Sequence, residues 1–375
     1  MAVGALPALA APDWCQNISD GLYCAEPEAT PPNFCGDKEI SVALADGFAD
    51  NPWRQMTTAA AINEASRCPN VIGWEHTDGQ GNTQKAISDL QGLAAKGVEA
   101  IVVFPDAGQA MLPAIRDAYK QGSAVVPYRV KVGGTEGQDY NVFVGTNFYD
   151  HGVIWAKWIA EAMGGKGTLG YEGGPPGNSE SEEKAQGMRD VLKDFPDIEW
   201  IGQEPFEATN WDPSLIAKSL TALIAKYPQI DGMFGDLSIP LLTSGAFQRA
   251  DRKMPLIAGE DANGFGCYWE KAQADGSDKN FQFMTTSAEQ WNVRLAIQWA
   301  IAEAAGGKVD QPLVVKDTKG GEHVVANPGD KIVTNFVMDD SLKGIVFCTP
   351  ELPDSAGNGT SLTTAQTLGA LKGGL

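Results

Sequence analysis

The stretch "ALADGFADNPWRQMTTAAAINEA", residues 43–65, runs from an apolar segment through a polar loop into an alanine-rich segment. A plain turn needs only Gly, Asn or Asp. This loop adds an indole and a guanidinium to a carboxylate and an amide: it holds Asp50, Asn51, Trp53 and Arg54. It therefore offers hydrogen-bond donors, acceptors and one flat apolar face, which is more than chain reversal requires.

The same order of apolar run, polar loop and helical segment repeats along the chain. Short apolar runs rich in β-branched residues predict strands at 39–45, 71–76, 99–104, 124–129, 141–145, 167–173, 198–204, 231–236, 255–261 and 281–286. Helix signals lie between them: Thr83 is positioned as a cap, and Asp212-Pro213 opens a segment with one apolar side. Repeated βαβ units predict parallel sheets with helices on both faces. Ten strands in 375 residues predict an α/β protein of two doubly wound parallel-sheet lobes.

Composition and charge narrow the function classes. The net charge of −20 argues against nucleic acid or an anionic membrane as a partner, because both need clustered Lys and Arg. No apolar run approaches the ~20 residues of a membrane span. The three histidines, His76, His151 and His323, are isolated in sequence and are read as structural or surface residues. We therefore expect no metal and no cofactor.

The cysteines indicate an oxidising compartment. Residues 1–11 resemble the end of a secretory leader, although they lack a basic start, and a disordered terminus is the alternative. Cys35 precedes the first strand and Cys68 ends the following helix, so an antiparallel helix brings them together. Cys15 and Cys24 would then staple the N-terminal extension, which leaves Cys267 and Cys348, but sequence does not fix the connectivity, and free thiols remain the alternative.

Polar and aromatic side chains follow the predicted strands. Ligands of open α/β sheets bind beyond the carboxyl ends of the strands, so these residues predict a ligand site in a cleft between the lobes. Carboxylates, amides and bases bond hydroxyls in both senses, and indoles stack on sugar C–H faces. Trp155, Trp158, Trp291 and Trp299 lie at helical spacing and are read as core. The candidates are Asn51, Trp53, Arg54, Asp78, Asp106, Arg129, Asn147, Lys184, Trp211, Asp236, Asp261 and Thr286.

At roughly residues 38–348 the chain resembles the type I periplasmic sugar-binding proteins of ABC importers, the ribose-binding group in particular. The motifs that carry the resemblance are "ISVALADGFADNPWRQ", "DGQGNTQKAISDLQGLAAKGVEAIVVFP", "VGTN", "KAQGM", "NWD", "YPQIDGMFGD" and "IAGED". By position, Asn51 and Trp53 match the family's ligand-contacting amide and stacking aromatic. The chain departs from the family pattern at Arg54, where many members have a second aromatic, and at Lys184, which replaces a common arginine and cannot form its bidentate fork. The loop "GDLSIPLLTSGAF" after Phe234 departs as well.

The resemblance also implies lobes that alternate along the sequence, with three crossings near 130–140, 284–288 and 308–330. The implied parts are a leader remnant and extension at 1–36, an N-terminal lobe of 37–132 plus 287–318, a C-terminal lobe of 133–286 plus 319–350, and a flexible tail at 351–375. It implies a monomeric periplasmic or secreted receptor that closes on a monosaccharide or polyol and delivers it to a membrane permease.

Other functions stay open at this point. Within the receptor class, the ligand could be an inositol, an autoinducer-like furanose or a nucleoside. A lactose-repressor-type regulator would carry a basic N-terminal helix-turn-helix, whereas residues 1–37 are acidic and rich in Cys and Pro. A carboxylate-using glycosidase would need an opposed pair of acids, and no pair stands out in the sequence.

Overall fold

The computed structural model describes residues 11–26, 28–310, 313–316, 322–325, 348–357 and 360–372. The leader-like residues 1–10 lie outside these ranges, and so does much of the predicted third crossing. The chain folds into two compact units. Of the described residues, unit 1 contains 11–145, 290–325 and 360–372, and unit 2 contains 146–289 and 348–357.

The unit boundaries differ from the expected ones. The first crossing falls at 145/146 instead of 132/133, and the second at 289/290 instead of 286/287. The reason for the first lies in the stretch after β4 (Ala124–Pro127), which stays bonded to unit 1. The Asn141 backbone donates to Val125 O, its side chain accepts from Val125 N, and Arg129 N donates to Val144 O at 2.7 Å. Residues 141–145, a predicted strand, make only a single bridge between Val144 and Tyr128.

Unit 1 is built on a four-stranded parallel sheet. The order is β2-β1-β3-β4, with β1 at Ile40–Asp46, β2 at Val71–Asp78 and β3 at Ala100–Phe104. Asp46 lies opposite both Asp78 and Phe104 in register. The carboxyl ends of three strands are therefore level, which brings the loops after them to one edge.

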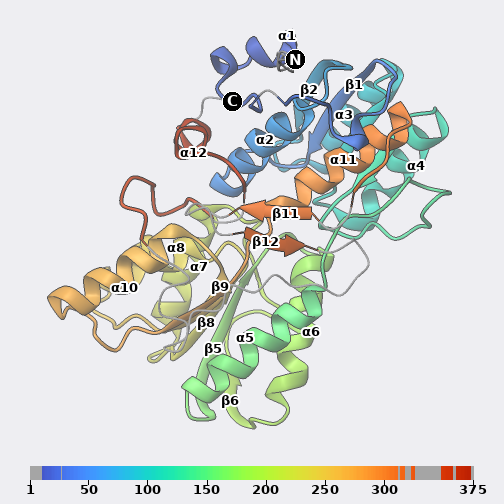
Figure 1. Cartoon of the computed structure of the whole chain (residues 1–375). Coiled ribbons are helices and arrows are strands. Elements are labelled where there is room, and N and C mark those ends of the chain that lie inside the picture. The colour runs from blue at the N-terminus through green and yellow to red at the C-terminus, as the bar shows by residue number, and fades with distance from the viewer. Residues whose placement is uncertain are drawn as a thin grey trace. The chain divides into compact units, whose positions relative to one another are not determined.

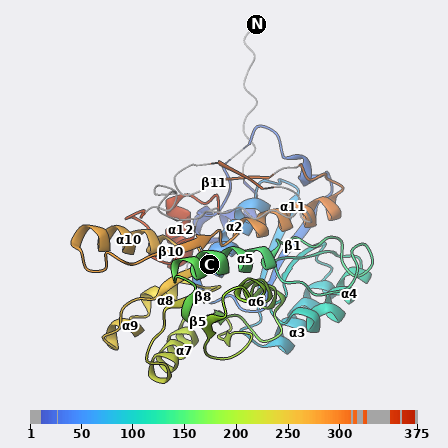
Figure 2. The same cartoon turned by 90° about the horizontal axis from the view of Figure 1, so that it is seen from below.

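Helices cover both faces of this sheet. One face packs on α3 (Thr83–Ala95) and α4 (Leu112–Lys120), which lie side by side in Figure 2. The short η3 (Gly108–Met111) leads directly into α4. The other packs on α2 (Pro52–Ala65) and α11 (Trp291–Ala305). Helix α3 begins one residue earlier than expected, because the Asn82 side chain, not Thr83, caps it by accepting from Lys85 N.

Unit 2 repeats the plan. Its parallel sheet has the order β10-β9-β8-β5-β6. The strands are β5 at Lys166–Gly173, β6 at Asp197–Trp200, β8 at Gly232–Gly235, β9 at Leu256–Glu260 and β10 at Phe283–Thr286. The short β7 (Glu207–Ala208) pairs with β5. Helices α5 (Phe148–Ala162) and α6 (Ser179–Leu192) cover one face and run side by side in Figure 1. The opposite face carries α7 (Pro213–Lys226), α8 (Ile239–Thr243), α9 (Ala246–Arg249) and α10 (Asn263–Asp275). The prediction of two doubly wound parallel sheets is confirmed.

Segments outside these sheets are also ordered. The N-terminal extension holds α1 (Asp13–Gln16), η1 (Ser19–Gly21) and η2 (Asn33–Cys35), and β11 (Leu313–Lys316) pairs antiparallel with β12 (Glu322–Val325). The predicted flexible tail contains α12 (Thr364–Leu371), which begins with a capping box of Thr363 and Gln366 and packs on α2.

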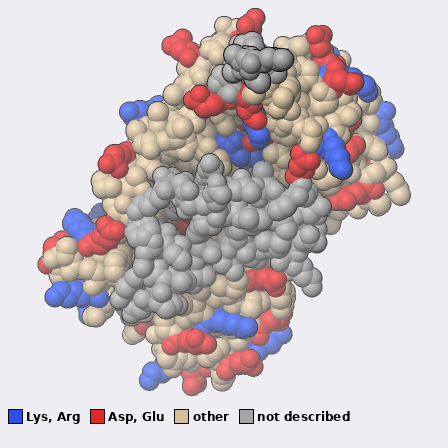
Figure 3. Space-filling model, viewed as in Figure 1, with Lys and Arg blue, Asp and Glu red and all other residues tan. Residues whose placement is uncertain are grey.

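All three favoured disulfides are present: Cys15–Cys24, Cys35–Cys68 and Cys267–Cys348. None of the helices in the described ranges is long and apolar enough to cross a membrane. On the face seen in Figure 3, acidic and basic side chains of the described residues are interspersed.

Candidate functional site

Most of the predicted site residues lie at the carboxyl-end edge of their own sheet. Unit 1 contributes Asn51, Trp53, Arg54, Asp78, Asp106 and Arg129. Unit 2 contributes Asn147, Lys184, Trp211, Asp236, Asp261 and Thr286. Each group forms a separate set of contacts.

The centre of the unit 1 group is Arg54, on the first turn of α2. Its guanidinium bridges two carboxylates, at 3.1 Å from Asp46 Oδ1 and 2.6 Å from Asp106 Oδ1. The flat cation also stacks on the Phe104 ring, with Cζ 3.2 Å from the ring centroid. We call Arg54, Asp46 and Asp106 the Arg54 cluster. A planar fork that bonds two acids and stacks on a ring uses the features that distinguish Arg from Lys, so Arg54 fixes where the Asp106 carboxylate points.

Aromatic rings line the same edge. Trp53 packs edge-to-face on Phe104, and the Arg129 guanidinium lies 4.9 Å from the Trp53 ring centroid. Arg129 has a φ of 64°, in the left-handed region, so the backbone turns sharply just after β4. Phe104 in turn packs edge-to-face on Tyr128. Burial raises the pKa of the Tyr128 phenol well above its usual value, and the Asp46 carboxylate adds to the rise, so Tyr128 stays a neutral hydrogen-bond donor.

Two predicted residues of unit 1 hold the loops themselves. Asn51 caps α2, where its side chain accepts from Arg54 N at 2.9 Å. Asp78 accepts from Ala49 N at 3.0 Å and Gln80 N at 2.7 Å, so it ties the first loop to the second. Gly47 lets the loops approach: a Cβ there would lie only 2.1 Å from Asp106 Oδ2. These residues pre-organise the edge.

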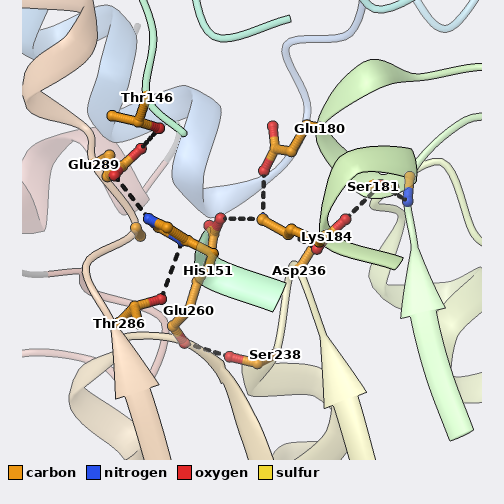
Figure 4. A network of polar contacts seen from close by, with 12 residues as sticks. Thr146, His151, Glu180, Ser181, Lys184, Asp236, Ser238, Glu260, Thr286 and Glu289 are labelled. Atoms are coloured by element: carbon orange, nitrogen blue, oxygen red, sulfur yellow. Dashed lines mark hydrogen bonds and ion pairs between the residues drawn. The ribbon is translucent and has the colours of Figure 1, made fainter. Parts of the chain in front are cut away.

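The centre of the unit 2 group is Lys184, on α6. Its ammonium lies 2.8 Å from Glu180 Oε1, 3.1 Å from Asp236 Oδ1 and 2.7 Å from Glu260 Oε1 (Figure 4). We call these four residues the Lys184 cluster. All four are buried. Three ammonium donors meet three carboxylates, so the lysine satisfies each acid with one charged hydrogen bond.

Further donors converge on Asp236. Tyr171 OH donates to Asp236 Oδ1 at 2.6 Å, and Trp211 Nε1 donates to Asp236 Oδ2 at 3.2 Å. The Ser181 hydroxyl also donates to Oδ2. Burial, followed by the Asp236 charge, raises the pKa of Tyr171 well above its usual value. Trp211 itself has a φ of 55° and presses on Gly174, where a Cβ would lie 2.4 Å from the indole.

The last two predicted residues hold the segment that leaves β10. Asp261 accepts from Ala288 N at 2.6 Å, and Thr286 accepts from Trp155 Nε1 at 3.0 Å. The adjoining Glu289 lies 3.1 Å from His151 Nε2 and accepts from the Thr146 hydroxyl at 2.6 Å (Figure 4). The segment 286–289 is thereby fixed to α5 just before the chain passes to unit 1.

Asn147 lies outside both clusters, at the start of α5. Its side chain caps α5, where it accepts from Asp150 N at 3.3 Å and donates to the Asp150 carboxylate at 2.7 Å. The structure gives it a local role at the helix start.

Five residues at these edges were missed by sequence reasoning: Asp46, His76, Tyr128, Glu180 and Glu260. Glu180 opens the acidic stretch "SESEEK", which is typical of a solvated helix face. Asp46, Tyr128 and Glu260 stand at or next to strand ends, and their position after an apolar run is the signal that could have found them. Among the residues that the structure describes, no group of three or more His, Cys, Asp or Glu could hold a metal ion.

The chain matches the family model described as "Periplasmic binding protein domain" over residues 42–308. It is 26% identical over 273 residues to the xylitol-binding protein of Mycolicibacterium smegmatis, which covers 71% of this chain and 72% of that protein. It is 24% identical over 239 residues to the ribose import binding protein of Bacillus subtilis, which covers 63% of this chain and 74% of that protein.

Solved structures share the fold. An ABC transporter solute-binding protein from Actinobacillus succinogenes with bound D-allose superposes with a TM-score of 0.59 at 21% identity, over 72% of this chain and 93% of that one. The arabinose-binding component from Shewanella, bound to L-arabinofuranose, gives a TM-score of 0.62 at 17% identity, over 72% and 88% of the two chains.

Proposed function

The chain belongs to the periplasmic binding protein family, and on that premise we propose that it is a receptor for a monosaccharide or polyol. The relatives named above bind xylitol and ribose by their names, and the structural neighbours hold aldoses. The observation that carries the proposal is the convergence of carboxylates, an ordered cation and an indole at the carboxyl-end edge of each sheet.

The chemistry of these edges suits a polyhydroxylated, uncharged ligand. The cations of the two clusters bond carboxylates, so each edge combines carboxylates, a phenol or an indole, and aromatic faces. A sugar hydroxyl can donate to a carboxylate oxygen and can accept from a phenol or an indole N–H. The C–H face of the sugar can pack on an aromatic ring. A phosphate or carboxylate on the ligand would instead meet acceptors of its own charge.

We propose the same twelve residues as the ligand-binding set, with three roles. Trp53, Asp106, Arg129, Trp211 and Asp236 are the contacting residues, and Arg54, Asn51, Asp78 and Lys184 position them. Asn147, Asp261 and Thr286 shape the loops that follow. Closure of the two units on the ligand would bring both edges to it, as in hinge-bending receptors.

Delivery of the ligand to an ABC importer permease is the second part of the proposal. Membership of a periplasmic receptor family, the leader-like start and the three disulfides support an extracytoplasmic location, periplasmic or secreted. We propose a monomer without a nucleic-acid partner, for which the net charge of −20 is the supporting observation. We also propose a non-enzymatic role, which membership of a periplasmic binding protein family supports. Saturable glycoside hydrolysis that Asp106→Asn abolishes would overturn it.

Thermal-shift screening against a panel of pentoses, hexoses, pentitols and inositols tests the function. A ligand present at a hundred times its Kd adds about 2.7 kcal/mol to the unfolding free energy, so a true ligand raises Tm clearly. We expect at least one sugar or polyol to raise Tm, and sugar acids and sugar phosphates of the same skeleton to leave it unchanged. A panel in which a nucleoside alone raises Tm would overturn the ligand class.

A further inference from the structure

Unit 2 contains a pocket of about 490 Å³ at the edge of its sheet where the strands begin. Lys166, which begins β5, and Asp231, which directly precedes β8, both line it. Leu256 begins β9 and lines the pocket, whereas Glu260 ends the same strand and belongs to the Lys184 cluster. The pocket and that cluster therefore lie at opposite edges of one sheet. Its volume falls within the roughly 300–1,000 Å³ that is typical of small-molecule sites.

The lining of this pocket is basic, although the whole chain carries a net charge of −20. Three bases line it: Lys166, Arg252 and Lys253. Among the described residues of the lining, Asp231 is the one acid. Its carboxylate accepts from Thr168 N at 2.8 Å and from the Gln229 side chain, so it is already held by neutral donors. The positive charge of the lining therefore exceeds its negative charge.

The three bases are not neutralised by their neighbours. Arg252 Nη1 donates to Ile224 O at 3.2 Å and to Tyr227 O at 3.1 Å, at the end of α7. Carbonyls at a helix end carry only a partial negative charge. Lys166 and Lys253 are exposed, and neither forms an ion pair with a residue in the part of the chain that the structure describes. The pocket thus offers charged donors to an anion.

Apolar side chains form another part of the same lining. They are Met163, Ile230, Met254, Pro255 and Leu256. Ile230 and Pro255 are buried, and Ile230 belongs to the core between the sheet and α7. Basic and apolar side chains in one pocket are complementary to a molecule that has an acidic group and an apolar part. The acidic group gains charge-assisted hydrogen bonds, and the apolar part leaves water.

We propose that this pocket binds a small amphipathic carboxylic acid, with a medium-chain aliphatic or an aromatic body. Lys166, Arg252 and Lys253 hold the carboxylate, and Met254 and Leu256 pack on the body. Sugar acids and sugar phosphates lack the apolar part, so they bind this pocket too weakly to raise Tm at the concentrations that saturate a receptor. A membrane lipid has the same two chemical parts, but the net charge of −20 opposes approach to an anionic bilayer.

Calorimetric titration of octanoate, butanoate and octanamide into the sugar-free protein tests the proposal. We expect octanoate to bind at least about tenfold more tightly than butanoate, because its longer chain removes more apolar surface from water. Octanamide keeps the chain but lacks the charge, and it is expected to bind at least about fivefold more weakly than octanoate. Equal affinities for the three compounds, or no binding of octanoate, would overturn the proposal.

Paired substitutions show whether octanoate occupies this pocket. Lys166→Gln combined with Lys253→Gln is expected to weaken octanoate binding at least about fivefold, and the corresponding pair of arginine substitutions is expected to restore it. The control is Lys157→Gln combined with Lys271→Gln, which makes the same charge change at exposed positions on α5 and α10 that do not line the pocket. Octanoate affinities that are equal in the two glutamine pairs would place the acid elsewhere and overturn the proposal.

Co-sedimentation with phosphatidylglycerol vesicles distinguishes a free acid from a membrane lipid. We expect the protein to stay in solution, since its net charge is −20. Sedimentation that Lys166→Gln with Lys253→Gln abolishes would assign the pocket to a lipid headgroup and overturn the proposal of a free acid. No sugar is present in these experiments, so their outcome is independent of the proposed sugar or polyol site.

Discussion

The Arg54 cluster of unit 1 and the Lys184 cluster of unit 2 both neutralise buried or partly buried carboxylates, but they do so with different cations. Both collect carboxylates at the carboxyl ends of a parallel sheet around one positive charge. Arg54 serves two acids, lies flat on Phe104, and leaves the Asp106 side chain 15% exposed. Lys184 serves three acids and is wholly buried with them.

This difference indicates that the two clusters have different roles, one in holding a carboxylate at the site and one in stabilising the fold. A stacked guanidinium that bonds two acids can hold one of them, the partly exposed Asp106, at the edge of a site. A buried ammonium with three acid neighbours is a structural centre, since removal of one partner leaves uncompensated charge in the interior. We therefore expect changes at Lys184 to act mainly on the stability of unit 2, and changes at Asp106 to act mainly on binding.

Lys184→Met gives the largest expected effect. It leaves Glu180, Asp236 and Glu260 buried without their cation, and loss of one partner of a buried ion pair costs about 3–5 kcal/mol. Urea unfolding followed by circular dichroism measures it. The matched control is Lys193→Met, whose pair with Asp190 is exposed to solvent and contributes little to stability. Similar midpoints for the two variants would refute a structural role for the Lys184 cluster.

Arg54→Met is expected to cost somewhat less, about 2–3 kcal/mol. Asp46 loses its guanidinium but keeps His76 Nε2 at 2.9 Å, and Asp106 is partly exposed and can be solvated. The same unfolding measurement applies, with Arg116→Met as the control, because its ion pair with Asp139 lies at the surface. A loss equal to that of Lys184→Met would show that the two clusters do not differ as proposed.

Glu172 is a buried acid that differs from those of the two clusters, because no cation is among the groups that shift its pKa. Burial raises the pKa of Glu172 on β5 to about 8, the Glu207 charge adds to the rise, and the Ser219 hydroxyl opposes it. The folded chain thus keeps a proton that the unfolded chain releases above about pH 4.5. The stability that this proton contributes is complete below pH 4.5 and is lost as pH rises through about 8.

Glu172→Gln removes this pH dependence. Relative to the unaltered protein, the variant should gain about 3–4 kcal/mol of unfolding free energy between pH 5 and pH 8, since each pH unit in that window is worth at most about 1.4 kcal/mol. Urea midpoints at both pH values measure the change. Glu161→Gln, an exposed position on α5, is the control. Parallel pH profiles for the unaltered protein and Glu172→Gln would contradict the assignment.

The fold could be predicted from the sequence wherever the apolar period was regular. The strand-and-helix repeats after residue 38 gave both sheets. The strand predicted at 141–145 was wrong, because its apolar run forms a single bridge at Val144 and otherwise bonds to β4 as a loop. The prediction of a flexible tail missed α12, because the Gly/Ser/Thr-rich composition suggested disorder. Thr363 and Gln366 show the spacing of a capping box, which was the available signal.

The site was predictable by position but not by role. Strand ends located Trp53, Asp106 and Trp211, because parallel strands bring their carboxyl ends to one edge. The partners of Arg54 and Lys184 come from 4 to 76 residues away in sequence. Only the packed sheet shows that these cations hold acids, so sequence alone suggested ligand contacts for both. Asn51 and Asp78 likewise proved to hold backbone amides.

Calorimetric titration tests most directly whether the two sheet edges form a sugar site. The sugar or polyol that raises Tm most is titrated into the unaltered protein, Trp53→Ala and Trp211→Ala. Each indole is expected to stack on the ligand, so the unaltered protein should bind one molecule per chain and each variant should bind at least about tenfold more weakly. Unchanged affinity in both variants, with the fold intact by circular dichroism, would contradict a sugar site built on these two edges.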